Sequence, residues 1–162
     1  MSTEKNLKEA FAGESQANRK YLAYAKKAEQ EGHKGIARLF YATAEAETIH
    51  AHNHLKALGE VKSTAENLQA GIDGETHEFD SMYPPMLEQA KAEGRKDAER
   101  SFLFAMKSEK VHADLYKDAL ENLDANEDAD YYLCPVCGYI EKGNAPDTCP
   151  ICGVKESMFI KY

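Results

Sequence analysis

Four long stretches of the chain place apolar side chains every three or four residues, the spacing that gives an α-helix one buried face. Glycines and capping residues set their limits. Thr3 is the expected cap of the first helix, Gly32 and Gly35 mark the turn after it, and Gly59 ends the second. The expected helices span residues 3–31, 34–58, 63–94 and 95–123.

The third stretch has two local signals. Ser63 followed by Glu66 forms the pattern of a capping box at its start. In its middle, Pro84 and Pro85 remove backbone donors, so we expect a kink or local break there. Four helices with short connections predict a mainly α fold, an up-down-up-down four-helix bundle, over residues 1–124.

The composition changes after Leu123. Residues 125–130 form an acidic linker with no apolar side chain larger than alanine, and residues 131–162 contain all four cysteines. A segment of that length is too short for a self-sufficient apolar core. We therefore expect a metal to hold this segment together as a small knuckle.

Ionisable residues interrupt the apolar stripe of every helix. Glu14 lies within the stripe of the first, which includes Leu7 and Tyr21, and Glu47 lies within that of the second, which includes Ile36 and Leu39. A buried, unpaired carboxylate costs several kcal/mol. Any single Glu among the 28 acidic residues is explained simply by an exposed helix face, so only a joint pattern is informative.

The joint pattern is specific. Glu-x-x-His occurs twice, on the second and fourth helices, and Glu-x-x-Glu occurs once, on the third. The chain thus repeats a helical hairpin that supplies Glu and then Glu-x-x-His, the ligand arrangement of di-iron carboxylate bundles. Carboxylate and imidazole ligands suit iron or manganese. The predicted ligands are Glu14, Glu47, His50, Glu75, Glu78, Glu109 and His112.

The remaining histidines are not assigned as ligands. His52 points nearly opposite to His50 on a helix, so the run His-Ala-His-Asn-His cannot converge on one metal. His54 lies one turn beyond His50, His33 falls in a turn, and His77 lies on another face than the paired glutamates.

Two Cys-x-x-Cys pairs close the chain. Cys134, Cys137, Cys149 and Cys152 can present four sulfurs tetrahedrally, and a glycine follows each pair. Zinc ribbons use the same spacing, so a structural zinc is the alternative. The wording Cys-Pro-x-Cys-Gly-Tyr resembles rubredoxin, and together with a redox-capable dinuclear site it favours a single iron.

Charge and length narrow the function further. The formal net charge of −8 argues against nucleic acid as the main partner. No apolar run is long enough to span a membrane, and the first residues lack the apolar segment of a signal peptide. We expect a cytoplasmic protein that does not bind a membrane.

The motifs together resemble the rubrerythrin family. The resemblance rests on Phe11-Ala-Gly-Glu-Ser-Gln-Ala-Asn18, Gly74-Glu-Thr-His-Glu-Phe79, Met82-Tyr-Pro84 and the cysteine-rich tail, and it covers essentially the whole chain. It implies a ferritin-like bundle followed by a small rubredoxin-like β knuckle, in a non-haem iron peroxidase that reduces hydrogen peroxide to water in oxidative-stress defence. Electrons from NAD(P)H would arrive through a rubredoxin or a rubredoxin reductase.

The resemblance also implies residue roles. One iron would move between His50 and Glu78 as its oxidation state changes, and Tyr21 and Tyr83 match family tyrosines beside the cluster. It implies a head-to-tail homodimer in which one subunit's knuckle faces the other's bundle, with helix exchange between subunits left open. A ferroxidase or iron-handling protein is the alternative function, although it would need neither Glu78 nor the cysteines.

Overall fold

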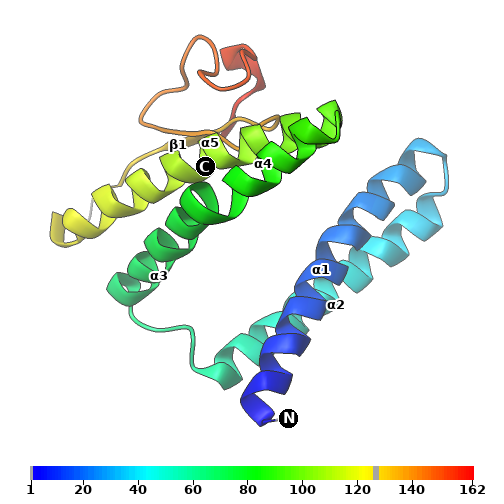
Figure 1. Cartoon of the computed structure of the whole chain (residues 1–162). Helices are drawn as coiled ribbons and strands as arrows, with labels where there is room; N and C mark the ends of the chain where they lie inside the picture. The colour runs from blue at the N-terminus through cyan, green and yellow to red at the C-terminus, as the bar shows by residue number, and fades with distance from the viewer. Residues whose placement is uncertain (1, 126–127) are drawn as a thin grey trace. The chain divides into compact units, whose positions relative to one another are not determined.

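The computed structural model describes residues 2–125 and 128–162, which pack as two compact units, Met1–Lys62 and Ser63–Tyr162 (Figure 1). The expected domains, residues 1–124 and 131–162, stay a prediction. The boundary between the two compact units lies after Lys62, in the loop that follows the second helix. Asn126 and Glu127 of the expected acidic linker lie outside the described residues.

The first unit is an antiparallel helical hairpin of α1 (Thr3–Gln30) and α2 (Lys34–Leu58). The cap of α1 is Ser2, not Thr3: the Ser2 side chain accepts from the backbone N–H of Lys5 at 3.2 Å. The hydroxyl of the residue just outside the helix is the one placed to satisfy a free first-turn donor. Gly59 ends α2 with φ +70°, a left-handed conformation that glycine adopts without steric cost.

Small side chains form the contact between α1 and α2. The buried residues of the two helices are all alanines: Ala25, Ala28, Ala37, Ala44 and Ala51. Alanine lets the helix axes approach closely, so the larger apolar side chains lie beside this contact rather than in it. Ile36 and Leu39 lie outside this contact and are 51% and 63% exposed, so their expected place on an inward-facing stripe stays a prediction.

The second unit begins with α3 (Thr64–His77), continues through the π-helical segment η1 (Glu78–Met82) into α4 (Tyr83–Ala92), and returns through α5 (Lys96–Glu121). The predicted capping box is present: the Ser63 hydroxyl accepts from the Glu66 N–H, and the Glu66 carboxylate accepts from the Ser63 N–H. Gly94, with φ +69°, forms the turn between α4 and α5.

The expected break at the prolines takes the form of a π-helical turn. Pro84 and Pro85 lie in the first turn of α4, where a missing backbone donor costs least. The regular α-helical hydrogen bonding gives way just before them, over Glu78–Met82. Such π turns inside α-helices often occur at functional sites.

The C-terminal knuckle has three short strands, β1 (Tyr131–Leu133), β2 (Ile140–Lys142) and β3 (Ile160–Lys161), in the order β2-β1-β3 with antiparallel pairing. Along the chain, the 3-10 turn η2 (Leu123–Ala125) precedes β1, and the 3-10 turn η3 (Glu156–Met158) lies between β2 and β3. The knuckle packs on α5 of the same unit: Phe104 contacts the buried cysteines, and Lys142 Nζ lies 2.8 Å from the Asp118 carboxylate.

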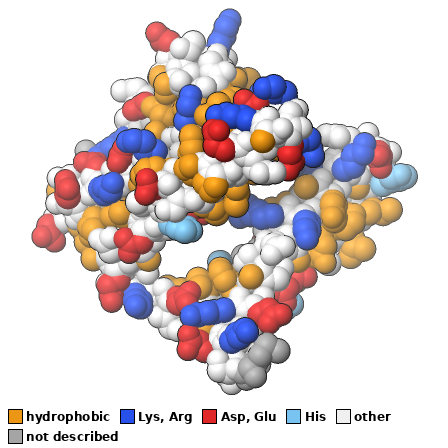
Figure 2. All heavy atoms as spheres, viewed as in Figure 1, with side chains coloured by type: hydrophobic (Ala, Val, Ile, Leu, Met, Phe, Trp, Pro, Cys, Tyr) orange, Lys and Arg blue, Asp and Glu red, His pale blue; other side chains and the backbone are white. Residues whose placement is uncertain are grey.

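Lys and Arg side chains are mixed with Asp and Glu over the face seen in Figure 2, as expected for a chain with 20 basic and 28 acidic residues. Among the described residues, the search for a helix of the length and apolar character needed to cross a membrane found none. The predicted fold class, a mainly helical chain of long bundle helices followed by a small β knuckle with four cysteines, is confirmed.

Candidate metal centres

The first hairpin brings three predicted ligands together. Glu14 on α1 meets Glu47 and His50 on α2, each offering a ligand atom within 4.8 Å of the others. His50 Nδ1 lies 2.9 Å from a Glu47 oxygen and 3.9 Å from a Glu14 oxygen. The i, i+3 spacing places Glu47 and His50 on one helix face, so both can bind one metal ion.

Asn18 joins the two helices one turn from this group. Its side-chain amide donates to the carbonyl of Ala44 at 2.7 Å and contacts the Thr48 hydroxyl at 2.9 Å. These bonds fix the register in which Glu14 faces Glu47. Asn18 belongs to the motif that carried the family resemblance, but helical spacing alone does not indicate this contact.

The second unit forms a matching group. Glu75 on α3 meets Glu109 and His112 on α5, again within 4.8 Å. His112 Nδ1 is 2.7 Å from a Glu109 oxygen and 3.6 Å from a Glu75 oxygen. All three side chains are about four-fifths buried, so these carboxylates carry the desolvation cost that the sequence pattern implied.

The charges of the second group are strongly perturbed. Burial and the neighbouring Glu109 carboxylate raise the pKa of Glu75 to about 7. Burial also acts on Glu109, but hydrogen bonds from His112 and Glu75 outweigh it and lower its pKa. Burial opposes the charged form of His112, yet the Glu109 carboxylate raises its pKa. Crowded carboxylates that hold protons in this way are a frequent property of metal sites before the metal binds.

Glu78 and Tyr83 lie at the two ends of the π turn. Neither belongs to the compact group of three, but burial and the charge of Glu109 raise the pKa of Glu78. Burial and the charges of Glu78 and Glu109 likewise raise the pKa of Tyr83. Tyr83 also packs against Phe102, with 6.1 Å between ring centres.

Tyr21 lies on the first hairpin, where its ring packs 6.1 Å from that of Phe40 and 6.3 Å from that of Tyr24. In the described parts of the chain, the compact donor groups do not include the unassigned histidines, His33, His52, His54 and His77. The individual roles expected for the ligands and tyrosines stay predictions.

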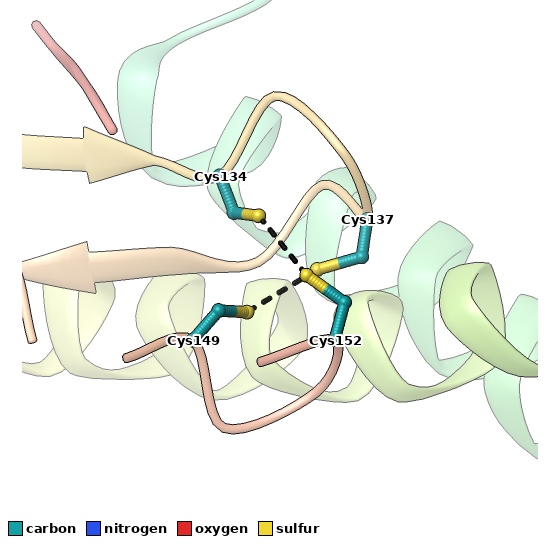
Figure 3. A group of neighbouring side chains, drawn as sticks. All are labelled: Cys134, Cys137, Cys149 and Cys152. Atoms are coloured by element: carbon teal, nitrogen blue, oxygen red, sulfur yellow. Dashed lines mark hydrogen bonds between the residues drawn. The ribbon is translucent and has the colours of Figure 1, made fainter. Parts of the chain in front are cut away.

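The four cysteines converge at the end of the knuckle (Figure 3). Sγ atoms of Cys134 and Cys152 lie 3.5 Å apart, as do those of Cys137 and Cys149. A tetrahedral metal with sulfur ligands at about 2.3 Å needs sulfurs about 3.8 Å apart, so the cluster nearly matches that requirement without rearrangement.

The two cysteine loops have the same backbone design. Gly138 N–H donates to the Cys134 carbonyl at 3.0 Å, and Gly153 N–H donates to the Cys149 carbonyl at 2.9 Å. Both glycines have positive φ, +86° and +77°. Burial raises the pKa of Cys149, but backbone N–H groups of Cys152 and Ile151 lower it more, to about 7, which favours the thiolate that a metal requires.

A direct contact links the cysteine loop to the second carboxylate group. His112 Nε2 lies 2.8 Å from the carbonyl oxygen of Gly138, the residue after Cys137. One imidazole therefore contacts Glu109 through Nδ1 and the cysteine loop through Nε2. Ser108, one turn earlier on α5, donates to the Cys137 carbonyl at 2.7 Å. The sequence indicated neither contact, because it does not reveal which helix the knuckle packs on.

Comparisons with known proteins agree with this arrangement. A family model described as rubrerythrin matches residues 5–120, and one described as rubrerythrin, rubredoxin-like domain, matches residues 132–160. Rubrerythrin-2 of Clostridium acetobutylicum is 39% identical over 170 residues, which cover 94% of this chain and 92% of the relative.

Nigerythrin of Nitratidesulfovibrio vulgaris is 40% identical over 175 residues, which cover 99% of this chain and 87% of the relative. Solved structures of nigerythrin in a mixed-valence state and in a fully reduced, all-ferrous state match all of this chain and 87% of theirs. Their TM-score is 0.62, at 41% and 40% identity. Since these matches cover nearly all of its length, this chain belongs to the rubrerythrin family, with a ferritin-like domain followed by a C-terminal rubredoxin-like domain.

Proposed function

We propose that this protein is a non-haem iron peroxidase that reduces hydrogen peroxide to water with electrons delivered through its cysteine knuckle. The observation that carries the proposal is the position of His112, which contacts Glu109 with one ring nitrogen and the cysteine loop with the other. A site that only stored or oxidised iron would not need this link.

The donor sets fit the metals that the family suggests. Carboxylates and imidazoles suit iron, and four thiolates suit a single iron or zinc. The carboxylate ligands would be Glu14, Glu47, His50, Glu75, Glu78, Glu109 and His112, and the thiolate ligands Cys134, Cys137, Cys149 and Cys152. When bound, two iron ions would supply the two electrons that peroxide reduction needs, and the thiolate-bound iron would take up and release one electron at a time.

The two groups of three would have to meet around one metal pair, as in other carboxylate bundles. Each group contributes two glutamates and a histidine, and Glu78 adds a seventh ligand near Glu109. We infer that His50 and Glu78 are the pair between which one metal position shifts, as the family resemblance implies. The nigerythrin structures, described in mixed-valence and all-ferrous states, support a site that changes oxidation state.

The hydrogen bond from His112 selects its ligand atom. Donation from Nε2–H to the Gly138 carbonyl fixes the tautomer, which leaves the Nδ1 lone pair directed at the space beside Glu109 and Glu75. The same bond forms a short covalent and hydrogen-bonded path from the Cys137 backbone to that nitrogen. Electrons from the knuckle would follow this path.

Reduction of one peroxide to two waters takes up two protons as well as two electrons. We infer that Tyr83 would be one proton source; burial and the charges of Glu78 and Glu109 raise the pKa of its hydroxyl, which therefore carries its proton at neutral pH. Glu75, with a pKa of about 7, is a second group that holds a proton near neutral pH. Tyr21 would serve on the side of the first hairpin.

The external donor would be a rubredoxin, an NAD(P)H-dependent rubredoxin reductase, or both in sequence. We further propose a head-to-tail homodimer, with an exchange of helices between subunits left open. Ferroxidase activity is the alternative function, since the same carboxylates would support it without the knuckle.

Cys134→Ser separates these functions. Cys134 is fully buried in the sulfur cluster, so its loss should abolish NAD(P)H-driven peroxide turnover through added donor proteins. One oxidation of chemically pre-reduced carboxylate-bound iron by peroxide should persist at the wild-type rate. The control is Ser157→Ala, in the η3 turn of the same knuckle but outside the sulfur cluster.

Equal loss of both activities in Cys134→Ser would refute the division of labour. Iron analysis with a visible spectrum tests the premise, because an iron(III) thiolate centre is red and bleaches on reduction. A colourless protein with zinc in the knuckle that still turns over peroxide would exclude the proposed electron route.

A further inference from the structure

Three residues at four-residue spacing on α5 face the cysteine knuckle. Phe104 packs against the buried cysteines, Ser108 donates to the Cys137 carbonyl, and His112 contacts the Gly138 carbonyl. Residues four apart lie on one face of a helix. This stripe, Phe104–Ser108–His112, therefore forms the docking face for the first cysteine loop.

Ser108 occupies the centre of that face and is only 1% exposed. Among the described residues, Ser108 is the only polar side chain that is buried. Its hydroxyl donates to the knuckle backbone at 2.7 Å rather than to its own helix. Serine is a poor choice for a helix interior unless its hydroxyl has a partner. The partner here is the backbone of a thiolate ligand.

The fit between Ser108 and the loop is close. A Cβ added to Gly138 would lie 3.7 Å from Ser108 Oγ and 3.8 Å from its Cβ, which are ordinary van der Waals distances, so the loop backbone at Gly138 packs directly against Ser108. Gly138 also has φ +86°, which other residues rarely adopt. Two consecutive loop carbonyls, those of Cys137 and Gly138, are thus held by side chains one helical turn apart.

We propose that Ser108 is a positioning residue that fixes the cysteine knuckle on α5 and thereby maintains the hydrogen bond between His112 and Gly138. Ser108 touches neither set of metal ligand atoms and acts through the Cys137 carbonyl. Its effect on electron delivery rests on the proposed function, whereas its effect on docking does not.

The docking role is tested in full-length protein with zinc in the cysteine site. Ser108→Ala leaves the Cys137 carbonyl without its donor, so zinc transfer to a chromogenic chelator should become about tenfold faster, the factor expected for one lost buried hydrogen bond. Ser101→Ala, an exposed serine two turns away on the same helix, is the matched control and should behave like wild type.

The electron-delivery role is tested in iron-loaded protein. With the knuckle reduced, electron transfer to the oxidised carboxylate site should slow by about tenfold in Ser108→Ala. Oxidation of the pre-reduced carboxylate site by peroxide should stay at the wild-type rate. A merely structural weakening of α5 would slow both reactions.

The outcomes are distinct. Ser108→Ala that matches Ser101→Ala in zinc release overturns the docking role, and faster zinc release with unchanged electron transfer overturns the role in electron delivery. If wild-type protein reduces no peroxide but the difference in zinc release persists, the proposed function fails and the docking role stands.

If Ser108→Ala fails to fold, the wild-type protein still tests the proposal. In wild-type protein with zinc in the cysteine site, NMR should show a slowly exchanging Ser108 hydroxyl proton and a nuclear Overhauser effect between the Ser108 β-protons and the Gly138 α-protons. Their absence would overturn the proposal.

Discussion

His112 shows how much one side chain can determine in this protein. Its Nδ1 faces Glu109 and Glu75, and its Nε2 faces the Gly138 carbonyl. Burial opposes its protonation, but the adjacent carboxylates raise its pKa, and the imidazole in turn lowers the pKa of Glu109, so each group favours the charged form of the other. A metal would displace the Nδ1 proton and leave the Nε2 bond in place.

The raised pKa of Glu75 predicts a pH dependence of metal binding. A ligand carboxyl must lose its proton to bind a metal. Because the pKa of Glu75 is about 7, protons compete with the metal when the pH is below that value. The apparent affinity of the carboxylate site for Mn²⁺ should rise by up to about tenfold per pH unit between pH 5.5 and 7, then flatten. The raised pKa of His112 acts in the same direction.

The measurement is a Mn²⁺ titration followed by EPR, with zinc in the cysteine site. Glu75→Gln should bind more weakly and show a shallower pH dependence, and the control Glu88→Gln, an exposed residue of α4, should match wild type. Affinity that stops rising near pH 5, as for a glutamate with an ordinary pKa, would contradict the role given to Glu75.

At the scale of elements, local signals were the reliable ones. Gly59 correctly marked the end of α2 and the Ser63–Glu66 capping box the start of α3, because helix ends depend on the few residues around them. The shift of the first cap from Thr3 to Ser2 is within the usual uncertainty of helix ends. The Glu-x-x-His pairs could also be predicted as joint ligands from the sequence, since helical geometry alone places the two residues on one face.

Features that depend on tertiary contacts could not be predicted from the sequence. The prolines indicated a disturbance in the third helix, but not that it would be a π turn beginning at Glu78. The alanine contact of the first hairpin left Ile36 and Leu39 exposed, although helical spacing put them on an apolar stripe. Which residues face a partner depends on how closely two helices approach, and a single stripe does not encode that distance.

The capping box of α3 predicts a measurable stability effect. Ser63→Ala removes the acceptor for the Glu66 N–H and should lower the free energy of unfolding by about 1 kcal/mol. Ser63→Thr keeps the hydroxyl and should lose much less. Denaturant unfolding followed by circular dichroism measures both, with Ser101→Ala as a mid-helix control; equal stability of Ser63→Ala and Ser101→Ala would show that the cap contributes nothing.

At the scale of the whole molecule, the central feature is the packing of the cysteine knuckle on the helix that carries Glu109 and His112. The family resemblance implies that one subunit's knuckle faces the other's bundle, whereas the structure places the knuckle on α5 of the same chain, against Phe104, Ser108 and His112. A homodimer remains compatible with both arrangements. They differ in which chain's carboxylate group receives the electrons.

Mixing two inactive variants distinguishes the arrangements. Cys134→Ser lacks a working knuckle but keeps Glu75, and Glu75→Ala lacks a working second group but keeps its knuckle. If each knuckle serves the α5 on which it docks, no chain of a mixed dimer has both parts, so co-refolded mixtures should stay as inactive in NAD(P)H-driven peroxide reduction as either variant alone. Co-refolding wild type with the double variant should retain turnover in proportion to wild-type chains, which controls for assembly. Recovered activity in the first mixture would instead show that electrons cross between subunits, and the contacts of Ser108 and His112 would then have to be made by the neighbouring chain's knuckle.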